Sequence, residues 1–416
     1  MRSNPVSGGW IASSLALLAM TAVTGCSTVA PAGSAFRPGT VVVAFDFKGE
    51  RGAWAEGLAD PSTGRLVTPD DPVRVASVSK LVVGIGVMKL VDRGALNLDE
   101  DVSRYLDWPM RNPNFPDRPI SLRMLLSHTS SLRDGDDAYV VPLGKTVKDA
   151  LADPAVWDAG HPPGEGWFAY SNFNFPLIAS IMEKVTGERF DIWMRREVIE
   201  PMKLDACYNW PTCSDAAIAQ AVVLTQDGRP VRDDLNGKRP DCPVFVEDGQ
   251  ACDLNRWRLG ENGALFSPQG GLRISARGLA RVGRMLMNQG TIDGVKILSA
   301  RSVDAMLAPT WQLSGGNGSR DGESRAMCSY GLAVQQLANR GPGCSGDPAR
   351  TGLAWAGHSG DAYGLRSGLW FDRNKGAGIA YFVTGLPDEP RRGRSGLTVA
   401  EEKAFRRAVS LLPQRP

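Results

Sequence analysis

The chain has 416 residues, of which 43% are hydrophobic and 22% are charged, and its formal net charge is +2. This composition is typical of a globular protein that can bury a sizeable core. The nearly balanced charge, with no long basic run, argues against nucleic acid as a partner.

The first residues have the pattern of an export signal. Arg2 precedes an apolar stretch over 10–23, which is rich in small residues and too short to predict a membrane span. It ends in V-T-G-C, which resembles the bacterial lipoprotein signal, where cleavage before the cysteine leaves its thiol to be lipidated. We therefore expect a lipoprotein signal peptide over 1–25 and a tether over 26–39. Acyl chains on Cys26 would anchor the protein to a membrane without spanning it.

This pattern predicts a lipid-anchored protein of the bacterial cell envelope that faces the periplasm. Ser27, directly after Cys26, favours the outer membrane by resemblance to other lipoproteins. The alternative is an ordinary signal peptide without lipidation.

Six further cysteines agree with export, because an even number in an exported chain indicates disulfides in an oxidising compartment. Many pairings are open, and we expect neighbours in the sequence to pair. A metal site is not expected, since there is no C-x-x-C motif and the three histidines are scattered, and no cofactor is expected. The six are Cys207, Cys213, Cys242, Cys252, Cys328 and Cys344.

The predicted elements begin with two strands around a turn, over 40–47 and 52–60. A helix follows over 77–93, and because it is apolar nearly all round we expect it to be buried. From residue 96 to about 252 the pattern is helical and is broken by Pro-rich loops. Within it, the stretch 204–261 indicates loops pinned by disulfides.

The C-terminal part contains an amphipathic helix over 275–290, for which Ser275 is a suitable N-cap. Strands and a last helix follow. Strands at both ends with helices between them predict an α+β fold in which both termini form one antiparallel sheet, flanked by helices. We place the domain at 40–412 and its mostly helical insertion at roughly 96–262. The last elements are strands over 329–337, 353–360, 364–372 and 377–385 and a helix over 399–412.

Ser77 and Lys80 lie three residues apart at the start of the predicted buried helix, so their side chains share one face. A serine needs a base to act as a nucleophile, and a lysine can be that base only when it is neutral. Burial and the helix N-terminus both disfavour the charged lysine, and the N-terminus also offers N–H groups to an oxyanion. By itself, however, S-x-x-K is better explained by a capping serine beside a snorkelling lysine.

Two further motifs change this interpretation. Y-S-N occurs at 170–172, where a helix begins, and H-S-G occurs at 358–360 on a predicted strand. In this order and spacing, S-x-x-K, Y-x-N and H-S-G resemble the serine β-lactamase and penicillin-binding-protein superfamily. The resemblance is strongest to the branch of class C β-lactamases, family VIII esterases, D-aminopeptidases and D-alanyl-D-alanine carboxypeptidases. It covers roughly residues 38–410, with supporting segments at 125–132, 163–172, 270–286 and 357–372.

The resemblance implies a β-lactamase-like fold and a role for each matching residue. Ser77 is the expected nucleophile, and Lys80 helps to deprotonate it. Tyr170 is the expected general base, which then passes the proton to the leaving group. Asn172 is expected to contact the substrate, although it is equally suited to cap a helix. The backbone N–H groups of Ser77 and Asp361 are the expected oxyanion hole.

His358 departs from the pattern of the penicillin-binding proteins and class C β-lactamases, which have a lysine at this position. A histidine is mostly neutral at pH 7, which weakens a β-lactamase interpretation and favours esterase-like or D-aminopeptidase-like members. With Gly360, His358 is expected to bind substrate. His128 is expected to bond to the backbone at a helix end, and no role is assigned to His161.

The sequence therefore predicts a serine hydrolase of small acyl esters. One alternative is a peptidase or amidase for D-amino-acid peptides, or a D-alanyl carboxypeptidase, with weak β-lactamase activity. Another is a non-catalytic module that binds the cell envelope. The expected partners are a small-molecule ester, amide or peptide substrate and the membrane. The loops over 204–261 are expected to line the rim of the pocket.

Overall fold

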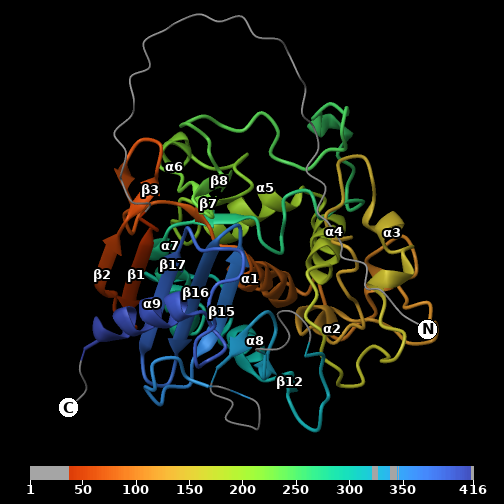
Figure 1. Ribbon diagram of the computed structural model, residues 1–416. Coiled ribbons are helices and arrows are strands. Elements are labelled where there is room, and N and C mark those ends of the chain that lie inside the picture. The colour runs from red at the N-terminus through yellow and green to blue at the C-terminus, as the bar shows by residue number, and fades with distance from the viewer. Residues whose placement is uncertain (1–36, 321–326, 338–343, 345, 414–416) are drawn as a thin grey trace, which may run out of the picture. The chain divides into compact units, whose positions relative to one another are not determined.

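An antiparallel sheet of eight strands, built from both ends of the chain, organises the part of the molecule that the structure describes (Figure 1). A computed structural model describes residues 37–413 except 321–326, 338–343 and 345. The expected signal peptide, Cys26 and most of the expected tether lie outside the described residues.

The strand order is β12-β13-β14-β15-β16-β17-β1-β2. Thr40 of β1 lies opposite Val383 of β17, so the first and last strands of the described chain are neighbours. This arrangement confirms the expected α+β fold with one sheet formed by both termini. The strands are β1 Thr40–Phe45, β2 Glu50–Glu56, β12 Trp311–Gln312, β13 Ser329–Tyr330, β14 Gln335–Gln336, β15 Ala356–Ala362, β16 Leu365–Asp372 and β17 Ala377–Val383.

Helices cover both faces of the sheet, so its central strands β16, β17 and β1 are buried along nearly their whole length. The last helix, α9 (Val399–Ser410), packs on one face, where Phe405 contacts Trp355 and Tyr381. Helices α7 (Ala276–Met287) and α1 (Val78–Asp92) pack on the other face. In Figure 1, α9 lies in front of the sheet, α7 lies behind it, and α1 lies beside β15.

Helix α1 is buried over nearly all of its circumference, as its apolar sequence predicts. It is enclosed by the sheet, by α8 (Ala300–Leu307) and by α4 (Asn174–Thr186). Close packing needs Gly86, because a Cβ atom there would lie 2.6 Å from Sδ of Met194. The start of α1, with Ser77 and Lys80, is consequently held in a rigid setting.

Short helices and loops occupy the segment between α1 and α7. Helix α4 ends at Gly187, whose φ of 71° is left-handed, and α5 follows at once. The region predicted as loops over 204–261 contains only short elements. The helices here are α2 Leu122–Leu126, α3 Val147–Ala150, α5 Phe190–Met194, α6 Asp215–Ala219, a π-helical turn Arg195–Ile199 and 3₁₀ turns Val102–Arg104, Pro154–Val156 and Leu254–Arg256.

Four small sheets lie outside the main sheet in the described part of the chain. The most important one joins β5, β9 and β6 in that order beside the start of α1. The small-sheet strands are β3 Leu58–Asp60, β4 Arg65–Leu66, β5 Val73–Arg74, β6 Cys207–Tyr208, β7 Leu224–Gln226, β8 Arg229–Arg232, β9 Leu272–Ile274, β10 Thr291–Ile292 and β11 Val295–Lys296.

Three disulfides pin loops of the described chain. They join Cys207 to Cys213, Cys242 to Cys252 and Cys328 to Cys344. The expected pairing of sequence neighbours is therefore confirmed.

The stretch 329–337, predicted as one strand, forms two strands joined by a tight turn. The amide of Gly331 donates to the carbonyl of Val334 at 2.8 Å, and Ala333 has a φ of 55°. A Cβ atom on Gly331 would lie 2.2 Å from the carbonyl oxygen of Met306, so the chain bends where it meets α8. Alternating hydrophobicity predicted the strands correctly but did not reveal this turn.

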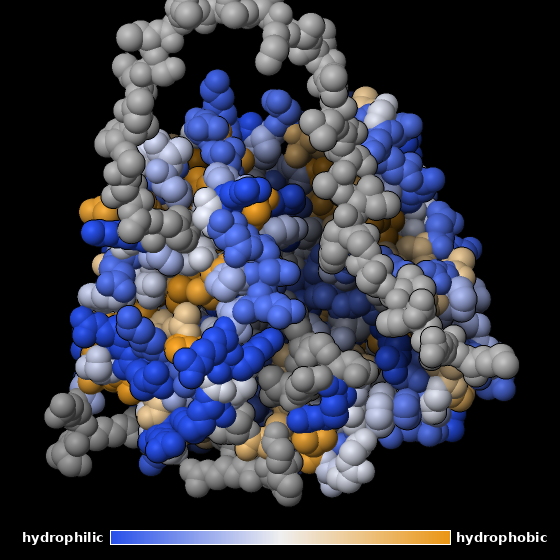
Figure 2. Space-filling model, viewed as in Figure 1, coloured by the Kyte–Doolittle hydropathy of each residue, from blue (hydrophilic) through white to orange (hydrophobic). Residues whose placement is uncertain are grey.

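On the face in Figure 2, hydrophobic residues lie in small groups among hydrophilic ones. Among the described residues, no helix is both long enough and apolar enough to cross a bilayer.

Candidate active site

The turn between β5 and α1 presents Ser77 at the start of a helix. Ala76 has a φ of 46°, which is uncommon for a residue other than glycine. The hydroxyl of Ser79 donates to the carbonyl of Ala76 at 2.6 Å and accepts from the amide of Leu272 in β9 at 3.0 Å. These bonds hold the turn, and with it the position of Ser77, against the small sheet.

Lys80 is completely buried, and its Nζ lies within hydrogen-bond distance of three oxygen atoms. These are Oγ of Ser77 at 2.8 Å, Oδ1 of Asn172 at 2.7 Å and the carbonyl of Gln269 at 3.0 Å. The last two can only accept, so they take two N–H groups of the amine. The third position of Nζ then faces the Ser77 hydroxyl, as a lone pair when the amine is neutral and as an N–H when it is protonated. When the amine is neutral, a proton can therefore pass from Ser77 to Lys80 without rearrangement.

Asp134 orients Asn172, and the sequence did not reveal it. Its Oδ2 accepts from Nδ2 of Asn172 at 2.8 Å, which leaves Oδ1 of the amide directed at Lys80. Asp134 also accepts from the hydroxyl of Ser171 at 2.9 Å and the amide of Phe173 at 3.2 Å. Burial raises the pKa of the Asp134 carboxyl, against the opposing hydrogen bonds from Ser171, Phe173 and Asn172. An aspartate in a loop carries no motif, so only the fold identifies it.

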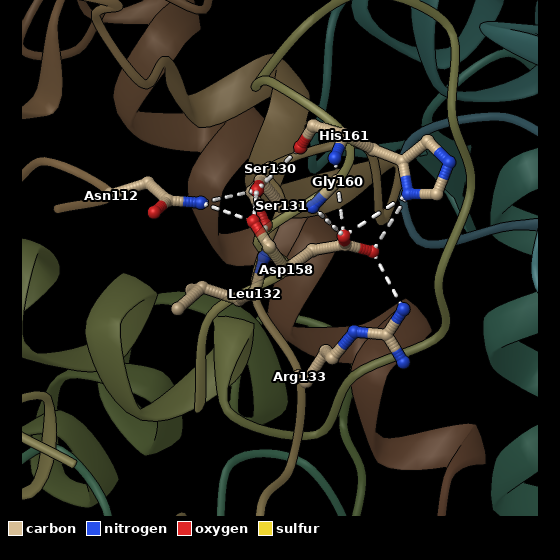
Figure 3. A network of polar contacts seen from close by, with 8 residues as sticks. All are labelled: Asn112, Ser130, Ser131, Leu132, Arg133, Asp158, Gly160 and His161. Carbon is tan, nitrogen blue, oxygen red and sulfur yellow. Dashed lines mark hydrogen bonds and ion pairs between the residues drawn. The ribbon is translucent and has the colours of Figure 1, made fainter. Parts of the chain in front are cut away.

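The loop that leads to Asp134 is held by a polar network around Asp158 (Figure 3). Asp158 accepts from Nη2 of Arg133 at 2.6 Å and lies 3.1 Å from Nδ1 of His161. Nδ2 of Asn112 donates to Oγ of Ser131 at 2.6 Å from the other side. His161, for which the sequence suggested no role, therefore belongs to a network that supports the loop.

Tyr170 lies beside Lys80. Nζ of Lys80 is 5.0 Å from the centroid of the Tyr170 ring, and the ring stacks on His128 with centroids 4.3 Å apart. The structure thus brings Ser77, Lys80, Tyr170 and Asn172 together, as the motifs predicted. The roles of Tyr170 as general base and of Asn172 in contact with substrate stay predictions.

His358 is completely buried, and both of its ring nitrogens are engaged. Nδ1 lies 2.6 Å from the carbonyl of Ser359, which can only accept, so Nδ1 carries the proton. Nε2 therefore accepts from the hydroxyl of Tyr330 at 2.8 Å. Burial, followed by the nearby charge of Lys80, lowers the pKa of His358 to about 3. His358 is consequently neutral, and a contact with substrate would require Tyr330 to release Nε2.

His128 continues this hydrogen-bonded chain on the far side of Tyr330. The amide of Ser171 donates to Nδ1 of His128 at 3.1 Å, so Nε2 carries the proton and donates to the hydroxyl of Tyr330 at 3.2 Å. Burial lowers the pKa of His128 well below its usual range. The expected bond of His128 to backbone is present, but its partner is Ser171 of the Y-S-N segment.

Strand β15 passes close to the nucleophile at Gly360. A Cβ atom there would lie 2.3 Å from the carbonyl oxygen of Val75 and 3.2 Å from the amide nitrogen of Ser77. A glycine thus lets the strand approach the start of α1. Asp361 follows on the same strand, and its carboxylate forms an ion pair with Arg366. The oxyanion hole formed by the amides of Ser77 and Asp361 stays a prediction, which this proximity supports.

A cavity of about 790 Å³ opens over these residues. Ser77, Asn172 and Asp361 line it, and so do Trp210, Arg232, Cys242 and Phe245 from the segment 204–261. The expectation that these loops line the pocket is confirmed. His358 is not among the residues that line it. Within the described parts of the chain, no group of three or more His, Cys, Asp or Glu side chains is placed to hold a metal ion.

The chain matches the family model described as Beta-lactamase over residues 29–402. Penicillin-binding protein 4 of Amycolatopsis lactamdurans is 27% identical over 271 residues, which cover 65% of this chain and 65% of that protein. Esterase EstB of Burkholderia gladioli is 30% identical over 173 residues, covering 37% of this chain and 42% of the esterase. Penicillin-binding protein 4* of Bacillus subtilis strain 168 is 28% identical over 153 residues, which cover 35% of this chain and 32% of that protein. The chain thus spans less than two thirds of the length of each of these curated relatives.

Solved structures show the same fold. The octameric penicillin-binding protein homologue from Pyrococcus abyssi has a TM-score of 0.62 at 20% identity, covering 90% of this chain and 74% of that one. The D-amino acid amidase from Ochrobactrum anthropi SV3, complexed with L-phenylalanine, has a TM-score of 0.63 at 18% identity. The match covers 90% of this chain and 93% of the amidase chain. Because the family model spans most of the chain, the protein belongs to the β-lactamase family, whose members are serine hydrolases.

Proposed function

We propose that the protein hydrolyses small acyl esters through an acyl-enzyme on Ser77. One observation carries the proposal, namely the 2.8 Å contact between Nζ of the buried Lys80 and Oγ of Ser77. Two acceptors hold the other positions of that amine, so its third position is directed at the nucleophile. This is the arrangement that a serine needs for activation by a neighbouring base.

The reaction begins when Oγ of Ser77 attacks the ester carbonyl carbon and its proton moves to Nζ of Lys80. The carbonyl oxygen gains negative charge, which the amides of Ser77 and Asp361 stabilise. The C–O bond to the leaving group then breaks as Tyr170 gives its phenolic proton to the departing oxygen and takes up the proton held by Lys80. Water next attacks the acyl group on Ser77 and gives one proton to Lys80. The bond between Oγ and the acyl carbon then breaks, and Oγ takes that proton, which releases the acid and restores the serine.

An ester substrate is favoured over a β-lactam because His358 is neutral and engaged by Tyr330. The likeness to the esterase of Burkholderia gladioli agrees with this choice. The alternative of a D-amino-acid amidase or carboxypeptidase keeps the same nucleophile and differs only in the bond that is cleaved. A panel of substrates distinguishes the two.

A fluorophosphonate probe tests the nucleophile, and we expect it to label the wild type at Ser77 and to leave Ser77→Ala unlabelled. A folded wild type that is not labelled would contradict the proposal and favour a binding module. Turnover of p-nitrophenyl butyrate, nitrocefin and D-alanyl peptides, measured side by side, then tests the substrate class. We expect the highest kcat/KM for the butyrate, and a higher value for D-alanyl peptides would establish the alternative.

We further propose that Cys26 carries the lipid anchor. The sequence pattern V-T-G-C supports this. The expected result is that Cys26→Ala moves the protein from the membrane fraction to the soluble fraction, and an unchanged distribution would contradict it.

A further inference from the structure

Arg74, three residues before the nucleophile, is buried in the wall of the active-site cavity without hydrogen bonds at two of its nitrogens. Arg74 is 6% exposed and lines the same cavity as Ser77. Among the described residues, neither Nε nor Nη1 has a hydrogen-bond partner. A guanidinium withdrawn from water in this way is costly unless an anion pairs with it.

The neighbouring buried cation shows what such pairing looks like. Arg273 donates from Nη2 to Oδ1 of Asp233 at 2.8 Å and from Nε to Oδ2 at 3.3 Å. Asp233 also accepts from the indole of Trp210 at 2.9 Å. The carboxylate of Asp233 is therefore engaged by Arg273 and Trp210, and Arg74 has no comparable ion pair among the described residues.

Charges of both signs surround Arg74, because beyond the effect of burial Arg273 and Arg232 lower its pKa and Asp233 raises it. Its guanidinium lies 5.1 Å from the centroid of the Tyr363 ring, and Arg232 lies 5.4 Å from the same ring. Burial, followed by the charge of Arg273, lowers the pKa of Arg74 to about 9, so the guanidinium is still protonated at neutral pH. Four carboxylates line the cavity, and none of them forms an ion pair with Arg74 among the described residues. They are Asp137, Asp233, Asp234 and Asp361.

Arg74 lies within reach of a substrate that is bound at Ser77. A Cβ atom built on Gly270 would be 3.6 Å from Nη2 of Arg74 and 3.8 Å from the carbonyl carbon of Ala76. The guanidinium and the peptide bond that precedes the nucleophile therefore approach the same point. Among the other basic groups near Ser77, Lys80 is held by Asn172 and Gln269 and His358 is neutral. Of the two other arginines that line the cavity, Arg273 is paired with Asp233 and Arg232 is exposed to solvent.

We propose that Arg74 binds a carboxylate of the substrate, so that the natural substrates are esters with a second, anionic group. A guanidinium can donate two parallel hydrogen bonds to a carboxylate from Nη2 together with either Nε or Nη1, and neither Nε nor Nη1 of Arg74 has a partner among the described residues. This inference rests on the proposed esterase function and adds the substrate class to it. The carboxylate belongs to the acyl group or to the leaving group, and the two are tested separately.

The experiment compares matched pairs of esters on the full chain. For the acyl side, the pair is mono-p-nitrophenyl glutarate and its neutral methyl ester. For the leaving-group side, the pair is the butyrate ester of p-hydroxybenzoate and that of methyl p-hydroxybenzoate. The readout is the ratio of kcat/KM for the anionic ester to kcat/KM for the neutral one.

We expect the wild type to prefer the anionic member of one pair by about tenfold to a hundredfold, the range for hydrogen bonds to a charged group. Arg74→Gln should reduce that ratio toward one. Arg232→Gln, which removes an exposed charge beside the same Tyr363 ring, should reduce it less, because exposed charges are screened by salt.

The inference would be overturned if the wild type hydrolysed the anionic and the neutral ester of each pair with the same kcat/KM. It would also be overturned if a preference for the anionic ester survived in Arg74→Gln. If Arg74→Gln does not fold, competitive inhibition of the wild type by glutarate and by dimethyl glutarate decides the matter, and equal inhibition counts against an anion site. Failure of the proposed function gives a different result, because no ester is then hydrolysed and the fluorophosphonate probe does not label Ser77.

Discussion

The hydroxyl of Tyr330 donates a hydrogen bond of 2.8 Å to Nε2 of His358. His358 is the first residue of the H-S-G motif, at the position where the resemblance to penicillin-binding proteins would place a cation. Because Tyr330 and the carbonyl of Ser359 engage both ring nitrogens, the site has an uncharged, internally bonded histidine there. This contact separates the structural role of His358 from the chemistry of Ser77 and Lys80.

The first prediction concerns the base. Lys80→Met keeps the buried shape but removes the amine, so acylation of Ser77 should slow by about a hundredfold or more. The rate of fluorophosphonate labelling measures this directly. Lys89→Met is the control, because it removes another amine of α1, which bonds to the carbonyl of Glu197. Labelling of Lys80→Met at the wild-type rate would show that Lys80 is not the base.

The second prediction concerns Asp134 as a positioning residue. Asp134→Asn removes the charged acceptor that orients the Asn172 amide, so kcat should fall by about tenfold or more with little change in KM. Asp136→Asn, an exposed change in the same loop, is the control. In an Asn172→Ala background, Asp134→Asn should have little further effect, because the two residues act as one unit. Additive losses in the double variant would indicate a merely structural role.

The third prediction concerns the close approach of β15 to the nucleophile. Gly360→Ala would put a Cβ atom 2.3 Å from the carbonyl oxygen of Val75 and 2.4 Å from Oγ of Ser367. The strand must move away from Ser77, so kcat/KM should fall by more than about tenfold, and overpacking should cost about 1–3 kcal/mol of stability. Gly49→Ala, which meets no atom within 4 Å, should leave both unchanged. Wild-type activity in Gly360→Ala would contradict the expected oxyanion hole.

The fourth prediction is a pH dependence of stability from His358. The unfolded chain binds a proton on this histidine below its ordinary pKa of 6.5, whereas the folded protein does so only near 3. The unfolded state thus binds more protons in this window. The contribution of His358 to the free energy of unfolding is therefore fully present above about pH 6.5 and is lost as the pH falls toward 3. Urea unfolding of the wild type and of His358→Gln across this window should show a shallower decline for the variant. His128 is retained in both proteins, so parallel curves would refute the assignment to His358.

The fifth prediction concerns the disulfide at the rim of the cavity. Replacing Cys242 and Cys252 by serine releases a loop that lines the pocket, so substrate preference should change more than the fold does. The loop is short, and the loss of stability should be about 3 kcal/mol or less. The matched control replaces Cys328 and Cys344, neither of which lines the cavity. A global loss of structure in the first variant, seen by circular dichroism, would contradict the prediction.

Several features follow from the sequence because their cause is local. The apolar run after Ser77 predicts a buried helix whatever surrounds it, and α1 is such a helix. Alternating hydrophobicity located the strands at both ends, and the S-x-x-K spacing places Ser77 beside Lys80 on one helical face. The order of the three motifs then indicated the family and the nucleophile.

Other features depend on contacts between residues that are far apart in the chain, so only the tertiary structure decided them. Asp134 reaches Asn172 across 38 positions, and Tyr330 reaches His358 across 28, with no local pattern that announces either contact. That two nitrogens of Arg74 have no hydrogen-bond partner in the described part of the chain is likewise evident only from the fold, which buries Arg74 and pairs Asp233 with Arg273. Sequence alone thus predicted which residue reacts, whereas packing decided which groups lie around it and which buried charge lacks an ion pair among the described residues.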